Sequence, residues 1–470
     1  MNIIEKKIPM TLCEEPIPYA YDEVPVLDAK DYQDRLTALW NMPQSAPYDH
    51  IIVYGDREHF SNIHYFTGYD PRWEESLLIL EREKPPVLLV GNEGIGYTRG
   101  LTADLDIRMF QTLSLMGQPN DDRSRKLIDI FKDCGIHADS HVGLIGWKSY
   151  DTGNFTGLPL VSDVPYYIVK TLEQIIPEEQ ITNAVDLMSD CQYGLKHNVC
   201  AKEIIQFEVN GTYISRGVYN LLKHVKPGMT ETEASRLLML DGQPLNMHPN
   251  INFGRNAGIS LMSPMPDSSL EYGMPMGVGY GMRGSLVHKK GLYIRNRQDI
   301  PAGQEGFIDD FLKPYFACVV RWYEMMKIGT SCGDIYDMVD DMLGMDKFGI
   351  TLNPGHLEHT DEWTNSPFYK GSQIRLRSGM MFQCDFSVHF SDPKMAAHVE
   401  DGLVLADADL QEEIRRLSPT CYERVMARRK FIREQLNIDL PEEVLPMSDL
   451  TLICNPYMAD ISVVLAKSEA

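Results

Sequence analysis

The segment from residue 353 to residue 407 constrains the fold most, because it sets charged side chains against apolar runs that are typical of buried strands. Asp385 lies in the sequence MMFQCD, Glu400 lies in EDGLVL, and His356 follows a Pro-Gly turn. A carboxylate inside a sheet is costly unless it is paired, protonated or bound to a metal. The three residues therefore predict an inward-facing polar site on a sheet. The alternative is three structural residues that each satisfy nearby backbone.

The composition restricts the classes of partner. The chain has 470 residues and a formal net charge of −23, which argues against nucleic acid because phosphate binding needs a basic surface. No apolar run approaches the length of a membrane span, and the first residues lack the apolar core of a signal peptide. The nine cysteines form no CxxC pair, which suits free thiols in a reducing compartment. We therefore expect a cytoplasmic protein with no nucleic-acid or membrane partner.

The first part of the chain alternates strand and helix signals. Strands are predicted at 50–54, 76–80, 86–90 and 142–145, and helices at 31–40 and 126–134, after an arm that ends near residue 28. Such alternation is typical of an α/β domain, which we place at residues 1–190.

The rest of the chain, residues 191–470, is predicted to form a second domain. A helix over 201–224 ends at Lys-Pro-Gly, and Thr230 with Glu233 forms a capping box for the next helix. Further helices are predicted at 314–327, 334–343 and 412–436, strands within 242–300 and 374–405, and a loop-like tail from residue 441. This pattern favours an α+β domain.

A basic cluster lies on the last predicted helix. It consists of Arg424, Arg428, Arg429, Lys430 and Arg433. Acidic segments flank the helix, so we interpret the cluster as a solvated or subunit-contact face.

The order of these features resembles the creatinase, prolidase and aminopeptidase P family, whose catalytic domain has the pita-bread fold. The resemblance lies in DHIIVYGDREHFSNIHYFTGYDPRWEESLLIL and PPVLLVGNE, and then in AKEIIQFEVNGTYISRGVYNLLKHVKPGMTETEASRLL, SGMMFQCDFSVHF and HVEDGLVLAD. It covers most of residues 30–407. It implies an α/β N-terminal domain plus an α+β pita-bread catalytic domain, a small-molecule substrate and a homodimer.

Metal-dependent members of that family hold two divalent ions with two aspartates, a histidine and two further acidic residues. The resemblance places the histidine at His356 and the last two acids at Asp385 and Glu400. The two aspartates fall on Gly277 and His288, neither of which is a carboxylate. The resemblance therefore implies either no metal, or a rearranged site for manganese, zinc or cobalt in which His356, Asp385 and Glu400 are ligands.

Two further histidines are candidate general bases, since imidazole titrates near neutral pH. His288 is one of them, if it points inward from its predicted hairpin. The other is His359, because a second family histidine falls on Trp363 and His359 is a polar residue nearby. With His356, Asp385 and Glu400, these complete the predicted catalytic residues.

Four residues are candidate substrate contacts. Asp361 and Glu362 are the other polar neighbours of Trp363, although both could simply cap a turn. Arg72 and Trp73 lie in a loop that, in relatives, reaches the substrate site of the partner subunit. An arginine beside an aromatic ring can hold a carboxylate or stack on a planar group.

Four functions stay open at the level of sequence. We favour a creatinase-like hydrolase of a C–N bond in a small polar metabolite, acting without the usual two-metal site. A metal-dependent Xaa-Pro peptidase would need the rearranged ligands. A lyase would remove a proton with a carboxylate, and a catalytically inactive binding protein would have no need to bury Asp385 and Glu400.

Overall fold

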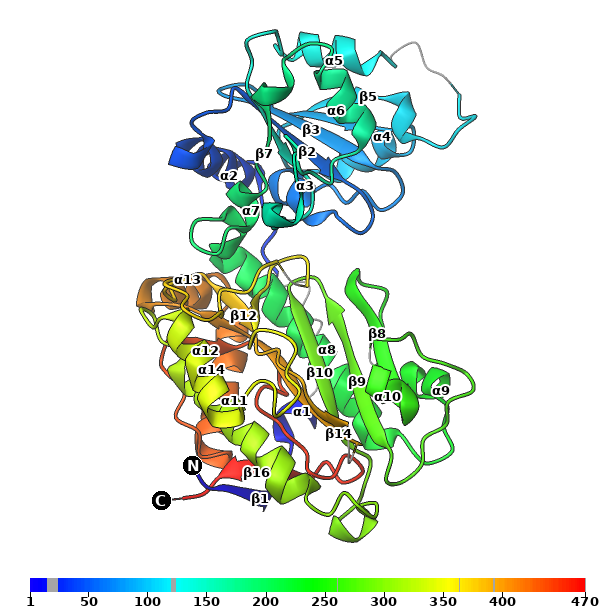
Figure 1. Cartoon of the computed structure of the whole chain (residues 1–470), viewed down its shortest axis with the longest axis vertical. Coiled ribbons are helices and arrows are strands. Elements are labelled where there is room, and N and C mark those ends of the chain that lie inside the picture. Colours follow the sequence, from blue (N-terminus) through cyan, green and yellow to red (C-terminus); the bar gives the residue numbers. More distant parts are fainter. Residues whose placement is uncertain (15–23, 120–123, 260, 363, 392–393, 470) are drawn as a thin grey trace. The chain divides into compact units, whose positions relative to one another are not determined.

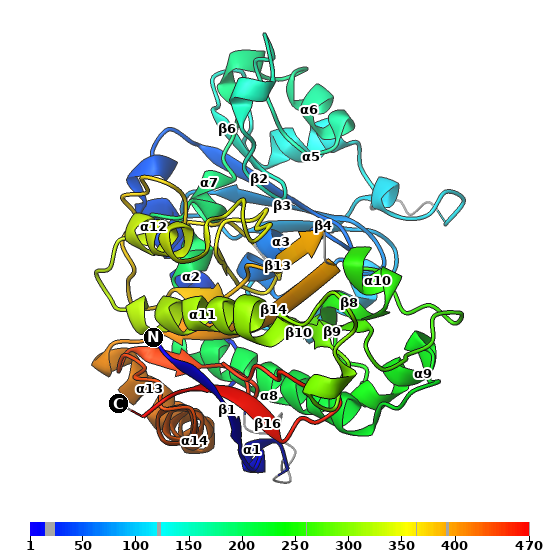
Figure 2. The same cartoon turned by 60° about the horizontal axis from the view of Figure 1, so that its bottom comes forward.

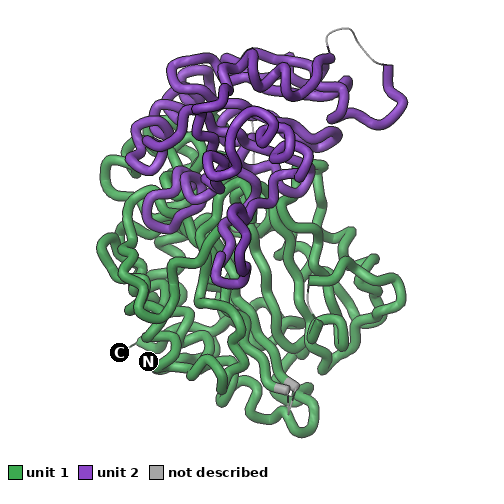
Figure 3. The backbone as a smooth tube through the Cα atoms, turned by 45° about the horizontal axis from the view of Figure 1, so that its top comes forward, with its two compact units in different colours: residues 1–25, 197–470 green, residues 26–196 purple. Residues whose placement is uncertain are grey.

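The computed structural model describes residues 1–470 apart from 15–23, 120–123, 260, 363, 392–393 and 470. The chain forms two compact units: unit 2 is Val26–Lys196, and unit 1 is Met1–Pro25 together with His197–Ala470 (Figure 3). The predicted domains, 1–190 and 191–470, differ from this division at the start of the chain. The first residues belong to unit 1 because β1 (Ile3–Lys7) pairs with β16 (Val463–Lys467).

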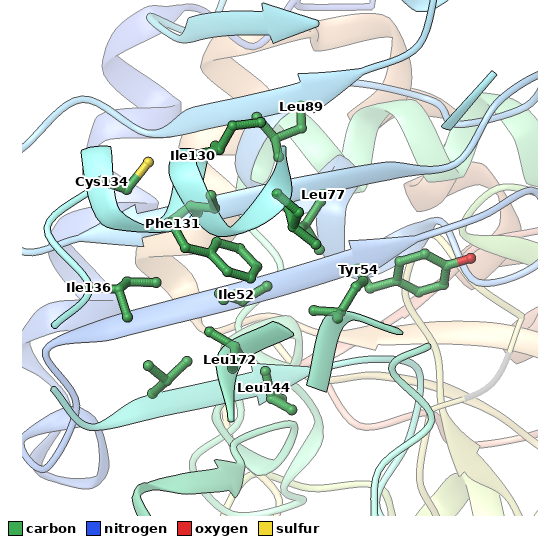
Figure 4. Close-up of a cluster of buried hydrophobic side chains, with 14 of the residues drawn as sticks. Ile52, Tyr54, Leu77, Leu89, Ile130, Phe131, Cys134, Ile136, Leu144 and Leu172 are labelled. Carbon is green, nitrogen blue, oxygen red and sulfur yellow. The ribbon is translucent and has the colours of Figure 1, made fainter. Parts of the chain in front are cut away.

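Unit 2 is built on a mixed six-stranded sheet with the strand order β5-β4-β3-β2-β6-β7. Its strands are β2 (His50–Gly55), β3 (Ser76–Glu81), β4 (Val87–Val90), β5 (Asp106–Met109), β6 (Val142–Ile145) and β7 (Ile181–Asn183). Its helices are α2 (Ala29–Asn41), α3 (Ser61–Thr67), α4 (Gly94–Tyr97), α5 (Leu127–Asp133), α6 (Tyr166–Leu172) and α7 (Asp186–Ser189). Ile52, Leu77 and Leu144 of the sheet pack with α5 and α6 in a buried core (Figure 4). The predicted α/β character of this part is confirmed.

Unit 1 contains an antiparallel sheet with the order β11-β12-β14-β10-β9-β8, and β13 and β15 also pair with β14. Its strands are β8 (Leu245–Phe253), β9 (Pro275–Met282), β10 (Ser285–Leu292), β11 (His356–Leu357), β12 (Met381–Gln383), β13 (Val388–Ser391), β14 (Lys394–Leu405) and β15 (Val444–Pro446). Figure 1 shows β8, β9, β10 and β14 side by side. The long strands β9 and β10 form a hairpin, which carries the positions where the family has its two aspartates.

Helices cover this sheet. They are α1 (Thr11–Glu14), α8 (Ala201–His224), α9 (Glu231–Ser235), α10 (Arg255–Ile259), α11 (Lys313–Met325), α12 (Cys332–Leu343), α13 (Ala408–Leu417) and α14 (Pro419–Gln435). The bounds of α8 are those predicted: the Cys200 N–H donates to Glu203 Oε2 (3.1 Å) at its start, and Pro227 follows its end. α8 packs on β9 and β10. In the described part of the chain, no helix is long and apolar enough to cross a membrane.

Three predictions of secondary structure are wrong. The predicted arm contains β1 and α1, and its residues 15–23 lie outside the described residues. The predicted helix 412–436 is two helices, because Pro419 begins α14 and the Ser418 hydroxyl caps it by accepting from the Cys421 N–H (3.3 Å). The tail contains β15 and β16, which complete two sheets.

Part of the basic cluster on α14 is buried, so its interpretation as a solvated face is wrong for Arg428 and Arg429, while a subunit contact through the exposed residues stays a prediction. Arg428 is only 1% exposed and forms ion pairs with Glu208 of α8 (2.7 Å) and with Asp449 (2.7 Å). Arg424 holds the other oxygen of Glu208 (2.6 Å). Burial alone would raise the pKa of Glu208, but the two arginines outweigh it and lower that pKa. The cluster therefore fixes α14 to α8.

Candidate active site

The register of unit 1 aligns side chains from four strands on one face of the sheet. Glu400 of β14 lies opposite His288 of β10, His288 lies opposite Gly279 of β9, and Gly279 lies opposite Asn250 of β8. Opposite residues of an antiparallel pair share a face, and so do residues two apart on one strand. The residues two positions away, such as His398 and Lys290, therefore lie on this face as well.

This face lines a cavity of about 740 Å³. The titratable side chains around it are His288, Lys290, His356, Glu362, Asp385, His398 and Glu400. A cavity of this size suits a small-molecule ligand.

Three carboxylates surround one histidine nitrogen in the cavity. His356 Nε2 lies 3.5 Å from Glu362 Oε1, 3.7 Å from Asp385 Oδ2 and 3.9 Å from Glu400 Oε1. Nε2 is buried and has no hydrogen-bond partner among the described residues. Carboxylates this close together, away from water, are costly unless a cation or protons lie between them. We call these four residues the His356 group.

A chain of hydrogen bonds, Asp385–His398–His288, forms the other part of the site. Asp385 Oδ1 lies 2.9 Å from His398 Nε2, and His398 Nδ1 lies 2.8 Å from His288 Nδ1. An ionised carboxylate only accepts, so His398 donates through Nε2 and, as a neutral ring, accepts through Nδ1. His288 then donates through Nδ1 and carries its lone pair on Nε2, a buried atom without a hydrogen-bond partner in the described structure. The chain therefore sets the tautomers of both histidines.

Burial controls the ionisation of these groups. It raises the pKa of Glu362 to about 8 and, together with the charge of Asp385, raises the pKa of Glu400 well above its usual range. Burial alone would also raise the pKa of Asp385, but the hydrogen bond from His398 helps to lower it. Burial lowers the pKa of His288 well below its usual value, so the His288 ring is neutral at pH 7.

The structure brings most of the predicted site residues together. His356, Asp385, Glu400 and His288 all line the cavity. Glu362, predicted as a substrate contact, also lines it and belongs to the His356 group.

The structure does not bring His359 into the cavity wall. Its ring is buried against α8, with Nε2 3.2 Å from Glu203 Oε1 and the edge of the ring against Phe207. The same loop makes a tight turn in which the His359 N–H donates to the Asp361 carbonyl (3.3 Å). Trp363 lies outside the described residues. His359 therefore packs against α8 outside the cavity wall, and its role as a base stays a prediction.

Arg72 and Trp73 belong to unit 2. Arg72 pairs with Asp70 (3.2 Å between Nε and Oδ2), and the Trp73 side chain is 77% exposed. Their contact with a substrate in a partner subunit stays a prediction.

Sequence reasoning missed three polar residues of the cavity, His398, Lys290 and Asn250. His398 stands two residues before Glu400, and Lys290 stands two residues after His288. The period of two in a strand could have found both, once β10 and β14 were known to extend that far. The period of two could not have found Asn250, because the sequence did not distinguish the strand β8 from the loops on either side of it.

Neither a protein-family model nor a curated protein sequence matches this chain. Solved structures do match it. A prolidase from Pyrococcus horikoshii OT3 is 12% identical with a TM-score of 0.59, over 79% of this chain and 95% of that one. A prolidase from Thermococcus sibiricus is 14% identical with a TM-score of 0.61, over 82% and 96%. The dipeptidase PepE from Mycobacterium ulcerans is 13% identical with a TM-score of 0.60, over 81% and 95%.

At these identities the likeness concerns the fold. The chain has the pita-bread fold of prolidases and aminopeptidase P, with an α/β unit, Val26–Lys196, that follows the first 25 residues. The predicted fold class is confirmed.

Proposed function

We propose that this chain is a hydrolase that cleaves a C–N bond in a small polar substrate, with one divalent cation in the His356 group instead of the usual two-metal site. The convergence of Glu362, Asp385 and Glu400 on the buried His356 Nε2 carries the proposal. The solved structures with this fold include prolidases and a dipeptidase, which supports an amide-type C–N bond.

The donor atoms of the His356 group suit an ion such as manganese, zinc or cobalt. These ions accept both imidazole and carboxylate ligands. The donor atoms of His356, Glu362 and Glu400 lie within 4.8 Å of one another, and a cation among them would offset their buried negative charge. Glu362 would supply a carboxylate in place of those missing from the β9–β10 hairpin.

A second set of possible ligands consists of His288, His398 and Glu400, whose donor atoms also lie within 4.8 Å of one another. In this set the two Nδ1 atoms already share a hydrogen bond, and Asp385 holds the other nitrogen of His398. We therefore assign these histidines to proton transfer.

When bound, the cation would polarise the scissile carbonyl and lower the pKa of a water molecule at its site. The protein supplies the base. Asp385 orients His398, and His398 orients His288, so the lone pair on His288 Nε2 is available in the cavity. His288 takes a proton from the attacking water at Nε2 and returns it to the leaving nitrogen. Because burial keeps His288 neutral, its basic form is present at pH 7.

A metal-free, creatinase-like hydrolase is the second candidate. The Asp385–His398–His288 chain favours it, because this chain orients a base without any ion. Glu362 would then donate the proton to the leaving nitrogen from its carboxylic acid form.

Metal content separates the two candidates. Full-length protein loaded with manganese, cobalt or zinc and then dialysed should retain a stoichiometric ion by mass spectrometry. Glu362→Gln should lose it, and the buried neighbour Glu358→Gln, outside the His356 group, should keep it. No retained ion with any of these metals would overturn the single-cation site and leave the metal-free candidate.

The same samples are then assayed against small amides, ureas, amidines, betaines and Xaa-Pro dipeptides, with and without chelator. The cation proposal expects turnover that chelator abolishes. Release of an unsaturated product would instead indicate a lyase, and stabilisation by a ligand without turnover would indicate a binding protein.

We also propose a cytoplasmic homodimer in which Arg72 and Trp73 reach the substrate site of the other subunit. Light scattering gives the oligomeric state. Arg72→Ala and Trp73→Ala should weaken substrate binding without changing metal content.

A further inference from the structure

Gly277 of β9 leaves space beside His288. Gly277 and Gly279 are two apart on the strand and lie on the same face as the cavity residues. A Cβ atom at Gly277 would lie 3.4 Å from His288 Nε2 and 3.5 Å from Lys290 Cε, so the protein leaves room above this backbone. At Gly279, by contrast, a Cβ atom would lie 2.4 Å from the Val287 carbonyl oxygen, so no side chain fits there. Gly277 therefore leaves room beside His288, whereas Gly279 lets β9 and β10 pack closely.

Asn250 is a buried residue of β8 that lies opposite Gly279 in the sheet. It is 1% exposed and lines the cavity. Within the described residues, neither its Oδ1 nor its Nδ2 has a hydrogen-bond partner. Folded proteins rarely leave both ends of a buried amide unsatisfied, because each unpaired atom has lost its water. The two atoms therefore point to a ligand that supplies both a donor and an acceptor.

We propose that Asn250 forms a subsite, in the cavity beside His288, for a planar amide-type group of the ligand, a carboxamide or a ureido group. Such a group offers an N–H to Asn250 Oδ1 and a C=O to Asn250 Nδ2. The absence of a side chain at Gly277 leaves additional room beside His288.

The same geometry disfavours other polar groups. A carboxylate only accepts hydrogen bonds, so it would leave Asn250 Oδ1 unsatisfied. An ammonium only donates, so it would leave Asn250 Nδ2 unsatisfied. The inference rests on the proposed function only in placing this group next to the C–N bond that is cleaved; binding itself needs no turnover.

Four small probes that differ in their polar group test the subsite: butyramide, propylurea, butyrate and butylamine. Their dissociation constants for the full-length chain are measured by saturation-transfer NMR, without any need for a reaction. Butyramide and propylurea should bind about tenfold more tightly than butyrate and butylamine, the effect of one well-made hydrogen bond. Equal or tighter binding of butyrate, or no binding of any probe, would overturn the proposal.

Variants then assign the preference to the named residues. Asn250→Leu should abolish the preference for amides, and Asn250→Asp, which keeps the shape, should shift it toward butylamine. Gly277→Ala should weaken binding of the amide without unfolding the protein, since the added Cβ meets only ordinary contacts. Asn365→Leu, a matched change elsewhere on the cavity wall, should leave the preference intact. A preference that survives Asn250→Leu would refute the subsite.

Metal content is measured on the same samples. An amide preference in protein that retains no metal would overturn the single-cation site alone. Retained metal without the preference would overturn the subsite alone.

Discussion

Replacing Glu362 by glutamine should change the stability of the metal-free and the metal-loaded protein in opposite directions. In the metal-free protein, burial raises the pKa of Glu362 from an ordinary 4.5 to about 8. Between these values the folded chain keeps a proton that the unfolded chain has lost, so stability falls as the pH rises from 4.5 to 8. At pH 7 the penalty is at most about 3.5 kcal/mol, since pH 7 lies 2.5 units above the unfolded pKa of 4.5 and each unit costs about 1.4 kcal/mol.

Glutamine has the same shape as glutamate and does not titrate, so Glu362→Gln should recover part of this penalty. Its unfolding free energy in chelator should therefore exceed that of the wild type at pH 7, and the difference should vanish toward pH 4.5. With metal the order reverses. An ion present at 100 times its Kd stabilises the folded state by about 2.7 kcal/mol, and a variant that binds the ion 100-fold more weakly retains about 0.4 kcal/mol of that.

Urea denaturation at pH 7, with chelator and with added manganese, measures both effects. Glu358→Gln is the matched control, because Glu358 is fully buried and accepts from Gln383 Nε2 (2.8 Å) but does not belong to the His356 group. It should leave the stabilisation by metal unchanged. If Glu362→Gln lowers the stability of the metal-free protein and keeps the full stabilisation by manganese, the carboxylates do not surround a cation.

Three further variants follow from the structure. His288→Gln should lower kcat on any substrate found in the panel by about 10²- to 10⁴-fold and leave metal content unchanged, because it removes the base and not a ligand; an unchanged kcat would remove His288 from the mechanism. Gly277→Asp has room beside His288 and adds a carboxylate to the hairpin, so it should raise the metal affinity measured in competition with a chelator. Unchanged affinity would show that this position is too far from the ion. Glu208→Gln should lower the unfolding free energy at pH 7 by about 3 kcal/mol, because Arg428 stays buried after losing part of its ion pairing. Since the folded pKa of Glu208 lies below 4.5, its stabilisation is present above pH 4.5 and is lost on further acidification, so the urea stability of the variant should depend less on pH in that range.

Local signals predicted helices and strands well where turn-forming residues mark their ends. The Lys-Pro-Gly turn indicated the end of α8, and the carboxylates beside apolar runs indicated Asp385 and Glu400. Contacts between distant residues could not be predicted in this way. Glu208 of α8 pairs with both Arg424 and Arg428, and it lies 216 residues before Arg424 in the sequence. A local pattern does not contain this pairing, so the basic cluster resembled a solvated surface.

The composition of the cavity was harder to predict than its position. Whether His398 and Lys290 point into the site depends on the register of β10 against β14, which a single sequence does not contain. The orientation of His359 depends on its packing against Phe207 of α8. A local sequence pattern does not contain this contact. Asn250 needed the pairing of β8 with β9 before its amide could be placed beside Gly279.

The pairing of β1 with β16 also affects how this protein is made. Ile3 lies opposite Lys467, and the Ser468 N–H donates to the Asn2 carbonyl (3.0 Å), so the two ends of the chain are neighbours in unit 1 (Figure 2). All of unit 2 leaves the ribosome before the long helix α8, whereas the sheet of β1 and β16 can close only after Val463–Lys467 has been synthesised. A rearranged gene could start at His197, join the present ends through a short linker, finish at Pro25 and omit unit 2. It would encode unit 1 as one continuous segment.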